Sequence, residues 1–354
     1  MAKVAPEILA VCSRRRRGIP APGSFPGPIT HERHSLRRAD VFTRRCSQGV
    51  AGQAPDKRRC DAMNSTPPKR IRQSEKKMNV LKIAAFSDGD TGGNPAGVLI
   101  DDELPGDREM QRIAAEIGFS ETAFATPTGA GWRVRYFSPE SEVPFCGHAT
   151  IALGAALALK HGDGVFALTL NHADITVEGR RHGGSIAAAL QSPPTHSTPA
   201  PQQLVSSALG LFGYTHDDLD PGIPPALAHG GADHLVLGLK TRAALAAMKY
   251  DLDAGRRLMN QAGLVTILLA YAETPRLFHT RNPFASGGIY EDPATGAATA
   301  ALAGYLRDMS WPHEGVIDIV QGEDMGVRSR LRAEIPPSPG SSIRVSGTAR
   351  VMPS

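Results

Sequence analysis

Two segments of this 354-residue chain, 149 positions apart, carry nearly the same sequence. Residues 147–153 (GHATIAL) and residues 296–302 (GAATAAL) are identical at five of seven positions. Each segment opens with a glycine and continues with small and apolar residues that favour an α-helix. The first N–H groups of a helix have no partner within it, so each copy would present donors at a helix start. The repeat therefore predicts an internal duplication whose two helix starts form an anion-binding cleft.

The sequence before each copy adds polar and reactive side chains. Before the first copy, residues 133–139 alternate between polar and apolar, which predicts a strand, and Cys146 directly precedes Gly147. Before the second copy, Asp292 stands ahead of the glycine turn and Thr295 occupies the place of Cys146. We expect these side chains to lie beside the proposed cleft.

Four sequence blocks occur in order along the chain, with a weaker fifth after them. The blocks are residues 93–98 (GNPAGV), 119–124 (FSETAF), 144–150 (PFCGHAT), 291–298 (EDPATGAA) and, more weakly, 321–326 (QGEDMG). Their order and their spread over residues 79 to 352 resemble the phenazine-biosynthesis isomerase (PhzF-like) family, which has the diaminopimelate-epimerase fold. One such block is a weak signal, but four in order are a strong one.

The resemblance implies an α+β fold of two pseudo-symmetric domains, each a mixed sheet wrapped round a central helix. We expect a first domain at residues 78–195 and a second at 202–341, with a last strand at 342–352 that returns to the first domain. The Pro-rich segment at 191–201 is predicted to be the linker between them. Helices are predicted at 107–117, 149–159, 202–210 and 298–307, the first of them ending at Gly118.

Residues 1–77 differ from the rest of the chain in charge. They hold 18 Lys and Arg against 6 Asp and Glu, whereas the remainder holds 21 against 29. Repeated prolines and few large apolar residues cannot bury a core, so we expect a disordered basic extension. A targeting peptide and an RNA-binding arm are the alternatives, although the apolar segment of the first and the aromatic residues of the second are missing. The family-like sequence begins after Met78, and we expect the extension to be dispensable.

Composition and cysteine use limit the class of protein. The chain is 41% hydrophobic without a long uninterrupted apolar run, which indicates a soluble globular protein, and we expect a cytoplasmic location without a membrane partner. Cys146 is the one cysteine outside residues 1–77, where Cys12, Cys46 and Cys60 have neither zinc-site nor disulfide spacing. The histidines lack the spacing of a zinc helix, so we expect no metal.

Glu121 is the predicted general acid and base. It follows a predicted helix end and lies in an apolar setting, Phe119 to Phe124, which suits a carboxyl group that moves a proton to and from carbon. The resemblance implies this role for the glutamate of the Ser-Glu-Thr motif. The simpler alternative is a solvated glutamate after a helix.

His148 and Asp292, one from each copy, are the next candidates. The resemblance implies that they bind the substrate and tune the proton of Glu121, and we add Asn94 and Cys146 to the expected substrate-binding residues. Gly147 and Gly296 would donate N–H groups to a carboxylate or enolate oxygen. Taken alone, His148 could equally be a helix-capping or core residue, and Asp292 a turn residue.

Two positions depart from what the resemblance implies. Racemases of this fold use one thiol from each copy, but the second copy here offers Thr295, whose hydroxyl is too weak an acid to replace a thiolate. Family members often carry serine where this chain has Ala297.

From the resemblance and the candidate residues together, we predict a cofactor-independent isomerase that acts on a small carboxylate-bearing molecule, forms a homodimer and binds no nucleic acid. The alternatives are an amino-acid racemase or epimerase that uses Cys146, and a non-catalytic binding protein.

Overall fold

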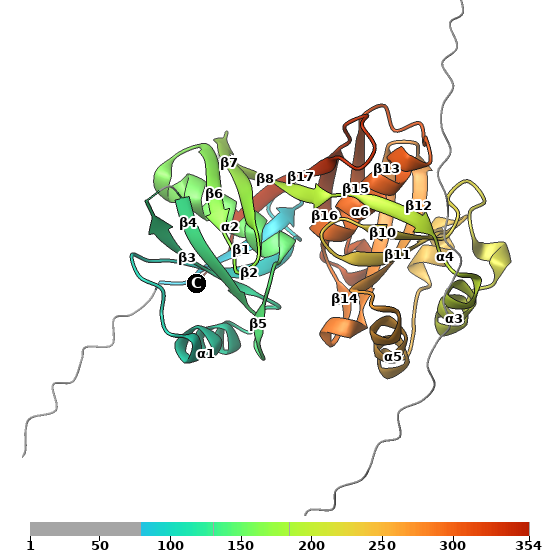
Figure 1. Cartoon of the computed structure of the whole chain (residues 1–354), viewed down its shortest axis with the longest axis horizontal. Coiled ribbons are helices and arrows are strands. Elements are labelled where there is room, and N and C mark those ends of the chain that lie inside the picture. The colour runs from blue at the N-terminus through green and yellow to red at the C-terminus, as the bar shows by residue number, and fades with distance from the viewer. Residues whose placement is uncertain (1–78, 130, 184, 354) are drawn as a thin grey trace, which may run out of the picture. The chain divides into compact units, whose positions relative to one another are not determined.

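The structure is a computed structural model, and it describes residues 79–353 except residues 130 and 184. The basic extension expected at residues 1–77, with its three cysteines, lies outside the described residues. The described chain has a mixed α+β fold in which long strands enclose two apolar helices (Figure 1). Among the described residues, no helix is both long and apolar enough to cross a membrane.

The first enclosed helix is α2 (Gly147–His161). The strands round it are β1 (Leu81–Ser87), β2 (Asn94–Ile100), β3 (Thr122–Thr128), β4 (Gly131–Phe137), β6 (Gly164–Thr169), β7 (Asp174–His182), β8 (Ser185–Pro194) and β17 (Ser342–Val351). Each pairs with the next and β17 pairs with β1, so the ring is closed; β2–β3 and β4–β6 are parallel, and the other pairs are antiparallel. A short β5 (Glu142–Val143) pairs with β4. Because strands surround it, α2 is buried on every side from His148 to Ala158.

The second enclosed helix is α6 (Gly296–Asp308). Its strands are β9 (His196–Pro199), β10 (Ala226–His229), β11 (Asp233–Gly238), β12 (Thr266–Thr274), β13 (Leu277–Phe284), β15 (Val316–Gln321), β16 (Ser329–Glu334) and again β17. They pair in that order, with β11–β12 and β13–β15 parallel, and β14 (Ile289–Asp292) pairs with β13. Since β17 pairs with both β8 and β16, it belongs to the strands round both helices (Figure 1).

Shorter helices complete the described chain. They are α1 (Asp107–Ile117), α3 (Gln202–Phe212), α4 (Arg242–Ala246) and α5 (Leu252–Ala262), with 3₁₀ turns η1 (His216–Asp218), η2 (Ala285–Gly287) and η3 (Glu323–Met325). The apolar face of α1 buries Met110 and Ile113 in a cluster with Leu99 and Phe124. As predicted, α1 ends at Gly118, which adopts the left-handed conformation with φ of 72°. This helix end sets the position of Glu121, three residues later.

The segment predicted to be the linker contains β-strands. Residues 191–201 hold the end of β8 and the whole of β9, and β9 pairs with β10 along its length. Prolines fall at the ends of these strands, at Pro194 and Pro199. A proline at a strand end removes no hydrogen bond from the interior of a sheet, so the Pro-rich composition did not exclude a strand here.

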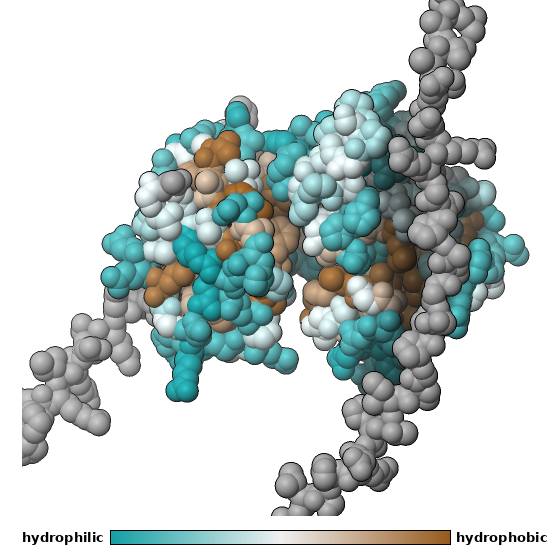
Figure 2. All heavy atoms as spheres, in the orientation of Figure 1, coloured by the Kyte–Doolittle hydropathy of each residue, from teal (hydrophilic) through white to brown (hydrophobic). Residues whose placement is uncertain are grey.

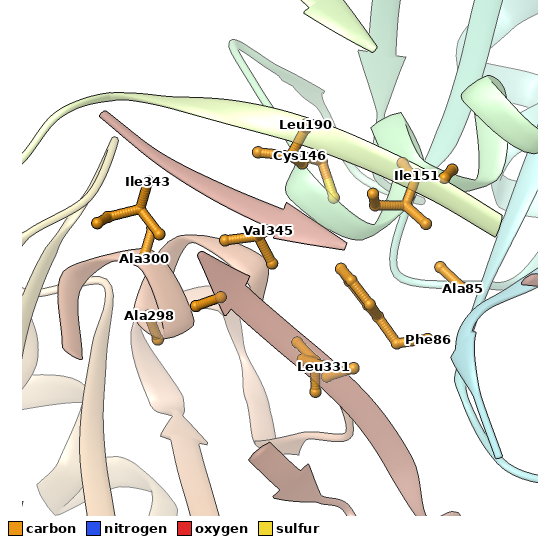
Figure 3. Close-up of a cluster of buried hydrophobic side chains, with 14 of the residues drawn as sticks. Ala85, Phe86, Cys146, Ile151, Leu190, Ala298, Ala300, Leu331, Ile343 and Val345 are labelled. Atoms are coloured by element: carbon orange, nitrogen blue, oxygen red, sulfur yellow. The ribbon is translucent and has the colours of Figure 1, made fainter. Parts of the chain in front are cut away.

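Phe86 joins the packing round the two enclosed helices. It lies at an irregularity of β1 and has a backbone φ of 59°, a conformation that few residues other than glycine adopt. Its ring is fully buried, and its tip would lie 3.6 Å from a Cβ added at Gly296. Figure 3 shows it among Ala85, Leu331 and Val345, in the cluster that also holds Ala298. The strained backbone therefore places a large ring beside the start of α6.

Candidate active site

The two copies of the repeated segment begin α2 and α6 at matching positions. Cys146 and Thr295 are the N-cap residues, and Gly147 and Gly296 are the first helical residues. Neither helix has a side-chain capping bond or an acidic residue in its first turn. A Cβ added at Gly147 would lie 3.6 Å from the Cα of Gly296, so the helix starts face each other closely. Their first N–H groups and positive dipole ends are therefore available to an anionic ligand.

A cavity of about 580 Å³ opens at these helix starts. Figure 2 shows the surface hollowed between the part of the chain round α2 and the part round α6, with apolar residues on both sides. Six of the seven residues predicted from the sequence line this cavity: Glu121, Cys146, Gly147, His148, Asp292 and Gly296. Asn94 does not line it. The volume suits a small molecule, as in most small-ligand sites.

Glu121 directly precedes β3, and its carboxylate is directed at His148. The Glu121 side chain is 12% exposed, and its Oε2 lies 3.3 Å from His148 Nε2. This Oε2 atom is buried and has no aligned hydrogen bond to any described residue. His148 Nε2 also lies 3.3 Å from Ser120 Oγ, which competes for the same ring nitrogen. The carboxylate therefore retains an oxygen that can accept a proton from a ligand.

Cys146 packs against the same two side chains. Its Sγ lies 3.3 Å from His148 Nδ1. Burial, with the neighbouring charge of Glu121, raises the pKa of the Cys146 thiol well above its usual value. A thiol that holds its proton so firmly is a poor base and a poor nucleophile.

We expect the Cys146→Ser variant to keep carbon-bound hydrogen exchange within about tenfold of wild type, because the change alters packing and leaves the proposed proton carrier in place. The measurement is the exchange rate of a confirmed substrate in D₂O. A loss of a thousandfold or more would restore a thiol mechanism.

Asp292 is held by a network from three other elements. Asn94 Nδ2 donates to Asp292 Oδ1 at 2.7 Å and to the Ala294 carbonyl at 3.1 Å. Thr295 Oγ1 donates to Asp292 Oδ2 at 2.5 Å. Gln321 Nε2 donates to the Asp292 carbonyl at 2.6 Å and lies 3.0 Å from Thr295 Oγ1. Asn94 thus positions Asp292 without lining the cavity itself, and the hydroxyl proton of Thr295 is used in the hydrogen bond to Asp292.

Burial raises the pKa of Asp292 to about 6, aided by the charge of Glu121 and opposed by His148, Thr295 and Asn94. The folded protein therefore keeps this proton between about pH 4 and 6, where the unfolded chain has released it. We expect the free energy of unfolding of wild type, relative to Asp292→Asn, to fall as the pH rises through this range and to level off above it. Denaturant titrations of both proteins at several pH values measure the difference. A difference that rises with pH would contradict this pKa direction.

The structure adds cavity residues that sequence reasoning missed. His229, Asp233, His234 and Thr266 line the cavity from β10, β11 and β12. The available signal in the sequence was the histidine that opens the apolar run at residues 235–237. Gln321 lay in the weakest sequence block and had no predicted role.

Two groups of side chains in the described chain have metal-ligand geometry. The ligand atoms of Glu121, Cys146 and His148 lie within 4.8 Å of one another, as do those of His196, His229 and Asp233. In the first group His148 contacts both the Cys146 thiol and the Glu121 carboxylate, at 3.3 Å each. In the second, His229 Nδ1 is bonded to Asp233 at 2.7 Å and its ring stacks on His196. Contacts within each group therefore account for its arrangement.

The fold is that of known solved structures. A PhzF-family phenazine biosynthesis protein from Bacillus anthracis superposes with a TM-score of 0.69 and 21% identity, covering 78% of this chain and 97% of its own. A probable proline racemase from Agrobacterium radiobacter K84 superposes with a TM-score of 0.54 and 12% identity, covering 77% and 90%. At these identities the likeness establishes the fold alone.

Sequence comparisons place the chain in a family. The family model for phenazine biosynthesis-like proteins, PhzC-PhzF, matches residues 83–353. The trans-2,3-dihydro-3-hydroxyanthranilate isomerase of Pseudomonas aeruginosa is 34% identical over 75% of this chain and 94% of its own length. The uncharacterized isomerase YddE of Escherichia coli O157:H7 is 31% identical over 70% and 85%. The chain belongs to the PhzC-PhzF family, and we assign it to the isomerase class of enzymes.

Proposed function

We propose that this protein is a cofactor-independent isomerase that moves a proton between carbons of a small carboxylate-bearing substrate, with Glu121 as general acid and base. The observation that carries the proposal is the buried Oε2 of Glu121, which has no aligned hydrogen bond to any described residue, on the wall of a cavity that opens at two uncapped helix starts. A carboxylate that accepts a proton from one carbon can return it to another, so no second base is required.

The substrate's carboxylate would bind in this cavity at the two helix starts. N–H groups at Gly147, Gly296 and the residues after them would bind it and stabilise the enolate charge that develops as the proton leaves. His148 and Asp292 flank this position and would hold the substrate against Glu121. Because Ala297 has no hydroxyl group, the substrate would differ from the substrates of relatives that carry serine at this position.

A two-thiol racemase has less support. It would need bases at both N-cap positions, but the Cys146 thiol has a raised pKa, and Thr295 donates its hydroxyl proton to Asp292. A binding protein without turnover would not need a buried carboxylate oxygen that lacks an aligned hydrogen bond.

We also propose that the strands and helices round α2 and α6 are two pseudo-symmetric domains that arose by duplication. The matching N-cap positions and the matching order of parallel pairs, β2–β3 with β4–β6 and β11–β12 with β13–β15, support this. The expected boundaries, 78–195 and 202–341 with a returning strand at 342–352, remain predictions, as do the homodimer, the cytoplasmic location and the absence of a nucleic-acid partner.

A deuterium-exchange screen tests the reaction type before the product is known. Small unsaturated and 2-amino carboxylates are incubated with the protein in D₂O, and proton NMR follows the loss of carbon-bound hydrogen. We expect at least one compound to exchange, and Glu116→Gln, at an exposed residue of α1 that does not line the cavity, to exchange it equally. A broad panel with binding but no exchange would favour the binding-protein alternative.

A further inference from the structure

The wall of the cavity where β11 and β12 begin carries a polar group that the proposed reaction does not use. His234 and Thr266 are register partners on these parallel strands, and both line the cavity. The His234 ring is fully buried, and its Nε2 has no hydrogen-bond partner among the described residues. A buried ring nitrogen without a partner is costly, and a donor on a ligand would remove that cost.

Hydrogen bonds on the other side of the ring determine which nitrogen carries the proton. Thr266 Oγ1 donates to Asn282 Oδ1 at 3.1 Å and lies 2.8 Å from His234 Nδ1. Because its one proton is directed at Asn282, the Thr266 oxygen accepts from His234, and Nδ1 must be the protonated nitrogen. Nε2 is then a hydrogen-bond acceptor.

The ring also stays neutral. Burial lowers the pKa of His234 to about 3; the nearby charge of Asp233 opposes the shift, and His229 adds to it. A neutral ring with a protonated Nδ1 cannot donate through Nε2. This wall of the cavity therefore accepts a hydrogen bond at neutral pH and offers none from this ring.

The wall differs chemically from the one that holds Glu121. Thr122 pairs with Gly97 across the parallel strands β2 and β3, as Thr266 pairs with His234 across β11 and β12. The residues before the two threonines, Glu121 and Val265, both line the cavity. One wall thus supplies an acid, and the corresponding wall supplies a valine and a neutral acceptor.

We propose that His234 is a specificity-determining residue whose Nε2 accepts a hydrogen bond from a hydroxyl or amino group of the substrate, with Thr266 and Asn282 holding the required tautomer. The inference rests on the proposed function, because it takes the substrate carboxylate to lie at the helix starts. A carboxylate without such a donor leaves Nε2 unpaired and binds more weakly.

The tautomer is tested first, on the ligand-free full chain. Nitrogen-15 NMR of the imidazole rings separates a protonated from an unprotonated ring nitrogen, and His234→Phe assigns the resonances. We expect an unprotonated Nε2 and a protonated Nδ1 in wild type, and a mixture of tautomers in Thr266→Val, which keeps the shape but loses the hydroxyl. A protonated Nε2 in wild type would overturn the proposal.

Binding is tested with matched probes that differ only in the donor. Butyrate is compared with 2-hydroxybutyrate and 2-aminobutyrate, and benzoate with 3-hydroxybenzoate and 3-aminobenzoate, by NMR titration. We expect wild type to prefer at least one donor-bearing probe about tenfold, the scale of one hydrogen bond, with a shift of the His234 Nε2 resonance. The hydroxyl and amino members show which donor is taken.

The variants decide whether His234 causes the preference. It should fall to about one in His234→Phe and decrease in Thr266→Val, which serves if the first variant does not fold. His216→Phe, at an exposed histidine of η1 that does not line the cavity, should keep it. No shift of Nε2 with any donor-bearing probe, or an unchanged preference in His234→Phe, would overturn the proposal. Neither readout needs turnover, so a failure of the exchange screen would sink the proposed reaction and leave this subsite standing.

Discussion

The Glu121→Gln variant is expected to bind substrate nearly as well as wild type and to turn it over about 10²–10⁴-fold more slowly, the usual scale of general acid–base catalysis. Glutamine keeps the shape of the side chain and a polar contact for His148, which lies 3.3 Å away, but it cannot accept a proton. Calorimetry gives the dissociation constant, and product formation gives the turnover number, so the two effects are separated.

Two other variants set the scale for this result. Glu116→Gln makes the same change on the exposed face of α1, where the side chain is 62% exposed, and should leave both quantities unchanged. Asp292→Asn should weaken both binding and turnover, since Asp292 is proposed to contact the substrate. Loss of binding in Glu121→Gln with an unchanged turnover number would show that Glu121 holds the substrate and does not carry the proton.

The Arg281→Met variant is expected to lose about 3–5 kcal/mol of unfolding free energy, because it leaves a buried charge without its partner. The Arg281 and Glu291 side chains are 8% and 2% exposed, and Arg281 Nε donates to Glu291 Oε1 at 3.0 Å. Arg281 also donates to the carbonyls of Ala246 and Met248 at 3.0 and 3.3 Å, which ties the end of α4 to β13. Glu291 directly precedes Asp292, so the same pair supports the cavity wall.

Denaturant unfolding measures this loss, and an exposed arginine provides the matched control. Arg276 pairs with Glu314 at 3.0 Å, but these side chains are 54% and 73% exposed, so Arg276→Met should cost at most about 1 kcal/mol. Removing both charges, as in Arg281→Met with Glu291→Leu, should recover part of the loss because no unpaired charge remains. An Arg281→Met variant as stable as Arg276→Met would mean that water or another group satisfies Glu291.

The parts of the fold that depend on local sequence were predictable. Neighbouring residues determine the helical spacing of apolar residues in α1, its cap at Gly118, and the glycines that begin α2 and α6. These helices begin and end within about two residues of their predicted bounds. The closeness of Gly147 and Gly296 was also inferred, because a duplicated segment would bring two equivalent helix starts together. The site residues taken from sequence motifs were those that precede or open these helices.

The features that depend on long-range pairing were not predictable in the same way. His234 becomes a cavity residue only because β11 pairs in parallel with β12, and the relay to Asn282 requires β12 to pair with β13. Asn94 lies in a Gly-Asn-Pro sequence typical of a turn, yet it begins β2 and donates a hydrogen bond to Asp292, which is distant in the sequence. Such contacts follow from register between distant segments, and composition alone does not set that register.

The central claim, that Glu121 carries the proton, is tested most directly by carbon-bound hydrogen exchange in D₂O with a substrate that wild type is known to exchange. Proton NMR measures the exchange rate for wild type and for Glu121→Gln at equal protein concentration and with bound fractions matched from the dissociation constants. The account predicts a rate in Glu121→Gln lower by at least about a hundredfold. Exchange at the wild-type rate would contradict it and would return the proton transfer to Cys146 or to another group in the cavity.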